Sequence, residues 1–321
     1  MTLRTSVGAL IGAVGLSLLA GPPAPASSVP PTPSTPSTPS IPSTAVPSAA
    51  APVAVAVVPP PLGEAPSSPR PAPTAARAPR PPAVLRLALT TANVRGAPSH
   101  EMAQPRVQAD LDLAARRGGA LLLQEIWPVR YKRAVRRTFA DRHVGLVRRS
   151  SNPVVVDRRW RVLERGRVTT TRTVPGTTPP RSLTWLVLAG DTASGPVRFV
   201  LMNTHFVAGA WNGRRDADVP LRQRLWDRHY RLMRRYVTDF NARGLTVVGG
   251  GDFNRRRSDG LLPFTDRQRW LFDDVGVDKL FVAPAPRGAR VRVVARATTQ
   301  ANSDHDFRTA WLRIAPAERS R

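Results

Sequence analysis

Eight side chains that can bind a metal ion or move a proton stand where apolar runs of this sequence begin or end. They are Asn93, Glu125, His205, Asp252, Asn254, Asp278, Asp304 and His305. Carboxylate and amide oxygens are the ligands that Mg²⁺ prefers, and histidine transfers protons near neutral pH. The set is typical of a site that holds a hard, oxygen-ligated cation beside groups that transfer protons.

Each of these residues also has a structural explanation when it is taken alone. Asn93 suits a turn, Glu125 and Asp278 suit solvated strand ends, and an Asp–Asn pair suits an Asx turn. Together they favour a site, because buried strands that run into unpaired carboxylates are costly unless a metal ion or hydrogen bonds meet the charge. Zinc fits less well than Mg²⁺ or Mn²⁺, since the chain has no cysteine and no HExxH pair.

The stretch LTVVGGGDFN, residues 245–254, gives the most local detail. In extended backbone, residues two apart point to the same side, so Asp252 and Asn254 are expected to face one site. Phe253 is then expected to pack on the opposite side. The three glycines that precede Asp252 are interpreted as room for a ligand to approach the backbone.

The apolar runs predict the elements that must position these residues. Strands are expected at 84–94, 119–126, 152–157, 182–189, 197–206, 245–251, 277–282, 291–297 and 309–314. Helices are expected at 105–118, 129–140 and 220–244. The strands in the middle of the chain have no helices between them. This order predicts a mixed α/β layered domain rather than a strict βαβ repeat.

The first 83 residues differ in composition from the rest of the chain. Arg4, an apolar run over 7–20 and the pattern APA at 24–26 are typical of a signal peptide at 1–26, with an uncleaved anchor as the alternative. Residues 27–83 are rich in Pro, Ser, Thr and Ala, which predicts a disordered linker: a functional stalk or an inert tail. We expect a secreted monomer, or one retained at the cell envelope by the stalk, with its domain at 84–321.

The charge of the chain points to an anionic partner. The net charge is +26, of which the first 83 residues carry +3 and the domain therefore +23. A basic domain is typical of a polyanion binder, and arginine suits phosphate groups. An arginine-rich chain with almost no lysine is also what a G+C-rich genome encodes, so charge alone leaves both explanations open. The absence of cysteine excludes a disulfide scaffold.

Five ordered blocks of the chain resemble the motifs of the endonuclease/exonuclease/phosphatase superfamily. They are TANVRG (91–96), LLLQEIW (121–127), LMNTHF (201–206), VVGGGDFN (247–254) and NSDHDF (302–307). The resemblance spans 84–321 and implies a four-layer α/β sandwich, in which two facing mixed β-sheets are flanked by helices. It also implies a site at one edge of the sandwich, where the strand ends meet.

The resemblance implies roles for the residues that hold metal and phosphate. Glu125 would be the main metal ligand, Asn93 beside it would contact metal or phosphate, and Asp304 would assist metal binding. Asp252 and Asn254 would hold the scissile phosphate and orient the nucleophile. The expected cofactor is Mg²⁺ or Mn²⁺, which compensates charge on the phosphoryl oxygens.

The remaining roles implied by the resemblance concern proton transfer. His305 would pair with Asp278, and His205 would protonate the leaving oxygen. Deoxyribonuclease-like members pair the histidine of the NTH block with a carboxylate from an earlier strand. The corresponding region here, RRSSNPVVVD, has no Glu, and Asn152 is the closest candidate.

The motifs predict phosphoester hydrolysis without naming the ester, because one scaffold serves many substrates. Nucleic acid is favoured, since basic and aromatic residues adjoin the site blocks. They are Trp211, Arg214, Arg215, Arg255 and Arg256. The alternatives are a sphingomyelinase or other phospholipid phosphodiesterase, a phosphatase of small phosphorylated compounds, and a non-catalytic polyanion-binding surface protein. GLLPF (260–264) is a faint candidate for a lipid-facing loop.

Overall fold

The structure is a computed structural model that describes residues 81–95, 102–145, 150–211, 217–256 and 276–317. The predicted signal peptide and nearly all of the predicted linker lie outside these residues, as do Arg214, Arg215 and the segment 260–264. No described helix is long and apolar enough to cross a membrane.

The first of two sheets has six strands in the order β10-β11-β1-β2-β4-β3. Their bounds are β1 Leu85–Asn93, β2 Ala120–Gln124, β3 Arg142–Gly145, β4 Val154–Asp157, β10 Arg290–Thr299 and β11 Phe307–Ala315. β1 runs parallel to β2 and antiparallel to β11, so the sheet is mixed.

The second sheet has five strands in the order β5-β6-β7-β8-β9. Their bounds are β5 Arg161–Thr171, β6 Arg181–Thr192, β7 Gly195–His205, β8 Thr246–Asp252 and β9 Asp278–Ala283. β7 and β8 are parallel, whereas the other neighbours are antiparallel, so this sheet is mixed as well.

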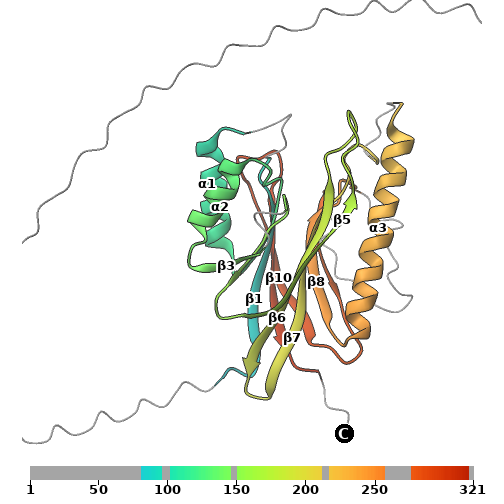
Figure 1. Ribbon diagram of the computed structural model, residues 1–321. Helices are drawn as coiled ribbons and strands as arrows, with labels where there is room; N and C mark the ends of the chain where they lie inside the picture. Colours follow the sequence, from blue (N-terminus) through green and yellow to red (C-terminus); the bar gives the residue numbers. More distant parts are fainter. Residues whose placement is uncertain (1–80, 96–101, 146–149, 212–216, 257–275, 318–321) are drawn as a thin grey trace, which may run out of the picture. The chain divides into compact units, whose positions relative to one another are not determined.

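Helices cover the outer face of each sheet, as Figure 1 shows. α1 (Gln104–Arg117) and α2 (Val129–Thr138) pack on the first sheet, and α3 (Val219–Ala242) packs on the second. An apolar core lies between the two sheets, where Leu89 and Leu122 of the first sheet meet Leu201 and Val248 of the second. The predicted four-layer α/β sandwich is therefore confirmed.

All nine predicted strands and all three predicted helices form, close to the expected bounds, but β3 and β5 were not predicted. β5 is the edge strand of its sheet, and its residues alternate between exposed and half-buried. Its sequence RVLERGRVTTT therefore has polar residues where a central strand would have apolar ones. β3 has only four residues, RHVG, too few to give a pattern.

Parallel pairing in both sheets brings four strand ends to one edge. β1 and β2 end at the register partners Asn93 and Gln124, and β7 and β8 end at the partners His205 and Asp252. Asn93 reaches Asp252 across the two sheets with a hydrogen bond. The carboxyl ends of parallel strands are where α/β sheets commonly bind ligands.

Candidate active site

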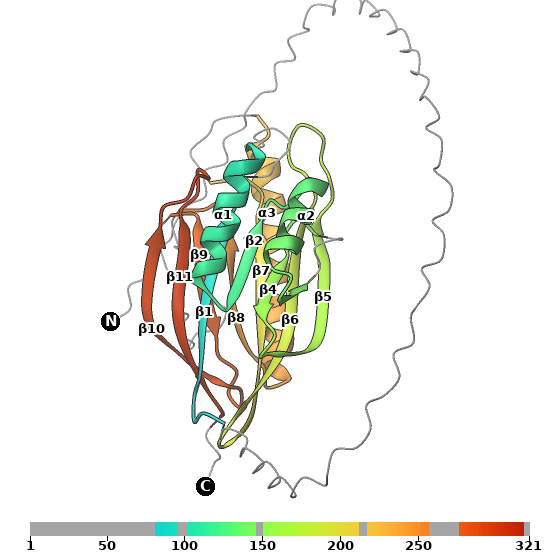
Figure 2. The same ribbon diagram turned by 90° about the vertical axis from the view of Figure 1, so that its left-hand side faces the viewer.

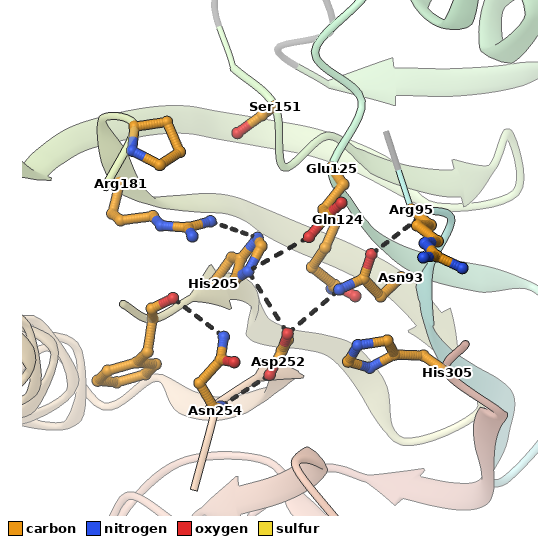
Figure 3. A network of polar contacts seen from close by, with 12 residues as sticks. Asn93, Arg95, Gln124, Glu125, Ser151, Arg181, His205, Asp252, Asn254 and His305 are labelled. Atoms are coloured by element: carbon orange, nitrogen blue, oxygen red, sulfur yellow. Dashed lines mark hydrogen bonds and ion pairs between the residues drawn. The ribbon is translucent and has the colours of Figure 1, made fainter. Parts of the chain in front are cut away.

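Figure 3 shows polar side chains from both sheets converging at this edge. Asn93 Nδ2 donates to Oδ2 of Asp252 over 3.2 Å, although the two residues are 159 positions apart. His205 Nε2 lies 3.4 Å from the same Oδ2 and 3.8 Å from Oε1 of Glu125, which follows β2. The fold thus brings together four residues that the sequence placed in one site.

Asp252 is the centre of this group and is almost fully buried. Its Oδ1 accepts the backbone N–H of Asn254 over 2.7 Å, and its Oδ2 accepts the Asn93 amide. Burial, with the Asp278 carboxylate adding to it, raises the pKa of Asp252 to about 7, while the charge of His305 opposes the rise. A carboxyl group with a pKa near neutrality can take up a proton in one step and release it in the next.

His205 has an arginine as its second partner. NH1 of Arg181, the first residue of β6, lies 2.8 Å from Nδ1 of His205. A guanidinium group can only donate, so Nδ1 accepts and the proton of the neutral ring is on Nε2, the nitrogen nearest Asp252 and Glu125. Burial and then the Arg181 charge hold the pKa of His205 well below its ordinary value, which keeps the ring neutral.

Arg181 itself is buried and remains charged. Burial lowers its pKa to about 10, and the carboxylates of Glu125 and Asp252 act against this shift. A pKa of about 10 leaves the guanidinium protonated at neutral pH. The positive charge of Arg181 therefore lies behind His205 and partly balances the carboxylates in front of it.

His305 has the opposite surroundings. Its Nδ1 lies 2.6 Å from Oδ2 of Asp278, the first residue of β9 and the register partner of Asp252. Burial alone would lower the pKa of His305, but the hydrogen bond to Asp278 and the charges of Asp252 and Asp278 raise it to about 10. His305 is therefore protonated at neutral pH. The pairing that the resemblance implied is present in the structure.

Backbone strain is concentrated at the same strand ends. Arg95, Glu125 and Asn254 have φ angles of 48°, 61° and 51°, and they are the only non-glycine residues with positive φ in the described part of the chain. A residue in this region costs about 1–3 kcal/mol and persists where its surroundings require it. Each of the three lies one or two residues beyond a strand that ends in the site.

The turn after β8 differs in one respect from the expected geometry. The strand ends at Asp252, so Asn254 is left-handed and its Nδ2 donates to the carbonyl of Phe206 over 3.2 Å. Phe253 packs away from the site, as predicted: it is fully buried and stacks on Phe206. Trp226 of α3 fixes the turn by donating from Nε1 to the carbonyl of Phe253 over 2.8 Å.

The glycines of β8 serve strand packing, so the interpretation that they leave room for a ligand was wrong. A Cβ at Gly251 would lie 1.9 Å from the carbonyl oxygen of Thr204, and one at Gly250 would lie 2.4 Å from that of Lys279. Both clashes are with neighbouring strands, β7 and β9, which already occupy the space beside the backbone.

The donor set at the edge fits a divalent cation. Oδ1 of Asp278 is buried and has no hydrogen-bond partner among the described residues, and Asp252, Asp278 and His305 place ligand atoms within 4.8 Å of one another. His305 holds a proton and bonds to Asp278, so it is a poor ligand at neutral pH. The oxygens of Glu125 and Asn93 are better ligands, and hard oxygen ligands suit Mg²⁺ or Mn²⁺.

The other predicted residues that the structure describes lie at the rim. Oδ2 of Asp304 is 3.6 Å from Nε of Arg95, and about half of the Asp304 side chain is exposed, at 53%. The guanidinium carbon of Arg255 lies 4.7 Å from the ring centroid of Trp211 and 5.3 Å from that of Trp226. Arg256 is exposed. The roles predicted for these residues in metal or substrate binding stay predictions.

Sequence reasoning missed Arg181. Asn152, the candidate partner of His205, instead donates from Nδ2 to the carbonyl of Ser182 over 3.1 Å, and Arg181 takes the place at His205 Nδ1. In an arginine-rich chain, the residue type alone did not mark Arg181 as a site residue. Its position could have done so, because Arg181 directly precedes the run predicted as the strand 182–189.

Sequence reasoning also missed His229, a fully buried residue of α3. Its Nδ1 and Nε2 lie 2.9 Å from the hydroxyl of Thr170 and 2.8 Å from that of Thr204. Its ring stacks on Phe206 with a centroid separation of 4.0 Å. Burial lowers the pKa of His229 well below its ordinary value. His229 therefore supports the strand end that carries His205 without reaching the site.

No protein-family model and no curated protein sequence matches this chain. Solved structures do match. An endonuclease/exonuclease/phosphatase from Bacteroides vulgatus superposes with a TM-score of 0.51 at 14% identity, over 72% of this chain and 99% of that one. TDP2 of D. rerio, humanized by mutation, gives a TM-score of 0.52 at 15% identity, over 71% and 98%. The chain has the endonuclease/exonuclease/phosphatase fold.

Within this fold, the blocks that suggested it from sequence supply the converging strand ends. TANVRG carries Asn93, LLLQEIW carries Glu125, LMNTHF carries His205 and VVGGGDFN carries Asp252. Similarity at this level of identity establishes the fold of the chain.

Proposed function

We propose that residues 84–321 are a metal-dependent phosphodiesterase that hydrolyses the phosphodiester bonds of nucleic acid. The observation that carries this proposal is the convergence of Asn93, Glu125, His205 and Asp252 at one edge, with protonated His305 beside them. A base, an acid, hydrogen-bond donors and ligands for a hard cation are the groups that phosphodiester hydrolysis needs.

Asp252 acts as the base in this proposal. It takes a proton from the water that attacks phosphorus, because its pKa of about 7 suits proton transfer near neutral pH. His305 gives its proton to the leaving oxygen, which departs as a hydroxyl while the other product keeps the phosphate. The proton on Asp252 is then lost to solvent, and His305 takes up another.

We assign His205 a different role from the one that the resemblance implied. The resemblance implied that His205 protonates the leaving oxygen, but a neutral ring whose proton is on Nε2 is a very weak acid. Nε2–H of His205 is instead a fixed donor for a phosphoryl oxygen, and Arg181 keeps it in that tautomer. Preorganised donors of this kind typically contribute ~10²–10³-fold to rate.

A cation held by Glu125 and Asn93 would supply positive charge to the phosphoryl oxygens and lower the pKa of a bound water, while Asp252 stays available to take the proton. The left-handed backbone of Glu125 fixes the direction of its side chain at the end of β2. The hydrogen bond from Asn93 to Asp252 joins the two sheets at this point.

Nucleic acid is favoured as the substrate by the arrangement of Arg255. Its guanidinium lies against the rings of both Trp211 and Trp226, one residue beyond Asn254. A stacked guanidinium is well placed to bind phosphate, and Trp211, 38% exposed, offers a surface on which a base can stack. TDP2 of D. rerio, which has this fold with a TM-score of 0.51 at 17% identity, was crystallised with a single strand DNA product.

A substrate panel tests the proposal. Plasmid DNA, RNA, sphingomyelin and inositol phosphates are incubated with the protein, each with Mg²⁺, with Mn²⁺ and with EDTA. We expect nicking of DNA or cleavage of RNA that depends on the metal and is lost in Asp252→Asn. Release of phosphocholine or inorganic phosphate without cleavage of nucleic acid would support one of the alternative phosphoesterases and overturn the nuclease assignment.

A second part of the proposal concerns location. We propose that residues 1–26 direct export and that residues 27–83 hold the domain away from the cell surface, on the basis of their composition. Fractionation of cells that express the full chain, with N-terminal sequencing of the exported product, tests this. A product that stays in the cytoplasm with an intact N-terminus would refute it.

A further inference from the structure

A row of arginines crosses the outer face of the first sheet, far from the strand ends of the site. Arg86 of β1 is the register partner of Arg313 of β11, which is also the partner of Arg292 of β10. Directly opposite residues on neighbouring strands point to the same face, so the three side chains stand side by side. All three are exposed. Figure 2 shows β10 and β11 beside α1 rather than beneath it.

This row is unfavourable for the protein alone. Like charges directly opposite one another destabilise a sheet. Within the part of the chain that the structure describes, none of the three side chains forms an ion pair or a hydrogen bond. Negative charge from a bound partner would relieve this repulsion.

The next row of the same face forms the floor of a groove. Trp311 stands between the register partners Ala88 and Ala295, whose small side chains leave space on both sides of the indole. The groove has a volume of about 540 Å³, and Arg86, Arg159 and Arg313 line it together with these three residues. Ligand sites in proteins commonly measure ~300–1,000 Å³.

We propose that this groove is a second binding site, which takes a stretch of single-stranded nucleic acid with its phosphates on the arginine row and a base against Trp311. Arginine and an aromatic ring together match the two repeating parts of that polymer, the charged backbone and the planar base. A lipid headgroup would use the charge but not the indole face. The inference deepens the proposed function, because the occupant is a distal part of the strand being cleaved.

The distance between the two sites sets a length requirement. Arg86 and Asn93 lie near opposite ends of β1, seven residues apart, which corresponds to about 23 Å of strand. A strand stacked as in a duplex rises ~3.4 Å per nucleotide, so about seven stacked nucleotides span the gap. Oligonucleotides of 20 nucleotides can contact both sites at once, whereas a stacked oligonucleotide of five occupies one site at a time.

The test compares two variants of equal charge. The triple variant Arg86→Gln, Arg292→Gln, Arg313→Gln removes the row. The triple variant Arg224→Gln, Arg228→Gln, Arg231→Gln removes three exposed arginines from α3 and serves as the control. Binding of the full chain to dye-labelled 20-nucleotide and 5-nucleotide DNA is measured by fluorescence anisotropy in EDTA, which separates binding from turnover. Vesicles that contain phosphatidylglycerol form the second arm.

We expect loss of the row to weaken binding of the 20-nucleotide DNA at least tenfold and to make its log Kd against log salt less steep by about 2, for three phosphate contacts. Binding of the 5-nucleotide DNA, which gains from only one site at a time, weakens less, and Trp311→Leu gives the same ranking of the two oligonucleotides. An equal loss in the α3 control, or selective loss of vesicle binding, would overturn the proposal. If the proposed function is wrong and the groove proposal is right, the protein will bind the 20-nucleotide DNA through the arginine row but will not cleave DNA when Mg²⁺ is supplied.

Discussion

Arg181 donates a hydrogen bond to Nδ1 of His205 over 2.8 Å, and both side chains are buried. The proton of His205 is thereby fixed on Nε2. His305 differs, because its Nδ1 faces the carboxylate of Asp278. The two histidines therefore differ in charge. His205 is a neutral hydrogen-bond donor, and His305 is a cation at neutral pH that can give a proton to a leaving oxygen.

The tautomer of His205 is a direct prediction. We expect long-range ¹H–¹⁵N NMR spectra at pH 7 to show His205 as the Nε2–H form and His305 with both nitrogens protonated. Arg181→Met should mix the tautomers of His205 and lower kcat by ~10²-fold, since a fixed donor is lost, whereas Arg181→Lys should retain more activity. A wild-type His205 protonated on Nδ1 would contradict this account.

The Asp278–His305 pair gives the second prediction. Asp278→Asn removes the charge that keeps His305 protonated, so we expect kcat to fall by ~10²–10⁴-fold with little change in KM. The matched control is Asp239→Asn on α3, which removes an exposed carboxylate paired weakly with Arg235. A change in KM without a change in kcat would show that the pair binds substrate rather than transferring a proton.

Removal of the metal ligand is the third prediction. Mg²⁺ or Mn²⁺ should raise the midpoint temperature of unfolding of the wild type, because an ion that binds only the folded state stabilises it. Glu125→Gln should abolish this rise and the heat of metal binding in isothermal titration calorimetry. In the control variant Asp239→Asn, Mg²⁺ or Mn²⁺ should raise the midpoint temperature of unfolding as much as in the wild type. If Glu125→Gln still binds the ion with wild-type affinity, Glu125 is not a principal ligand.

His229 gives a prediction on pH. Its pKa is lowered in the folded state from an ordinary value of 6.5, so its neutral form stabilises the fold above that value. As pH falls below 6.5, the unfolded chain binds the proton first and the free energy of unfolding drops, by at most about 1.4 kcal/mol per pH unit.

His229→Gln keeps hydrogen-bonding groups near Thr170 and Thr204 but does not titrate. The difference in the free energy of unfolding between wild type and this variant should therefore shrink from pH 7.5 to pH 5. Urea unfolding at several pH values measures it. A difference that grows on acidification would mean that His229 is protonated in the folded state.

Arg255 tests how substrate is held at the rim. Arg255→Gln removes the charge between Trp211 and Trp226, and we expect KM for nucleic acid to rise several-fold more than KM for bis(p-nitrophenyl) phosphate, which has no polymer backbone. Arg287→Gln, at a distant position between β9 and β10, is the control. An equal rise for both substrates would assign Arg255 to the scissile phosphate itself.

The sequence predicted the central strands and the converging residues for a common physical reason. A buried strand must be apolar, so a carboxylate, amide or imidazole at its end is conspicuous, and Asn93, Glu125, His205 and Asp252 all have this position. Parallel pairing then placed them at one edge, which the register of β1 with β2 and of β7 with β8 confirms.

Other features could not be read from residue types. Arg181 is one arginine among many, and its place at His205 depends on how β6 lies against β7. The glycines of β8 resembled a ligand-binding turn, yet their requirement comes from Thr204 and Lys279 on the adjacent strands. Asn254 departs from strand alternation because β8 ends before it.

The strand order also determines when the candidate site can be complete as the chain folds. The second sheet comes from one continuous segment, Arg161–Ala283, whereas β1 in the first sheet pairs with β11, so that Leu85 meets Ile314. Contacts so distant in sequence form slowly and only after both partners exist. β1, β2 and β4 can pair with one another before β11 exists, whereas His305 lies just before β11 and is the last site residue to be made. The candidate site therefore lacks His305 until nearly the whole domain has been synthesised.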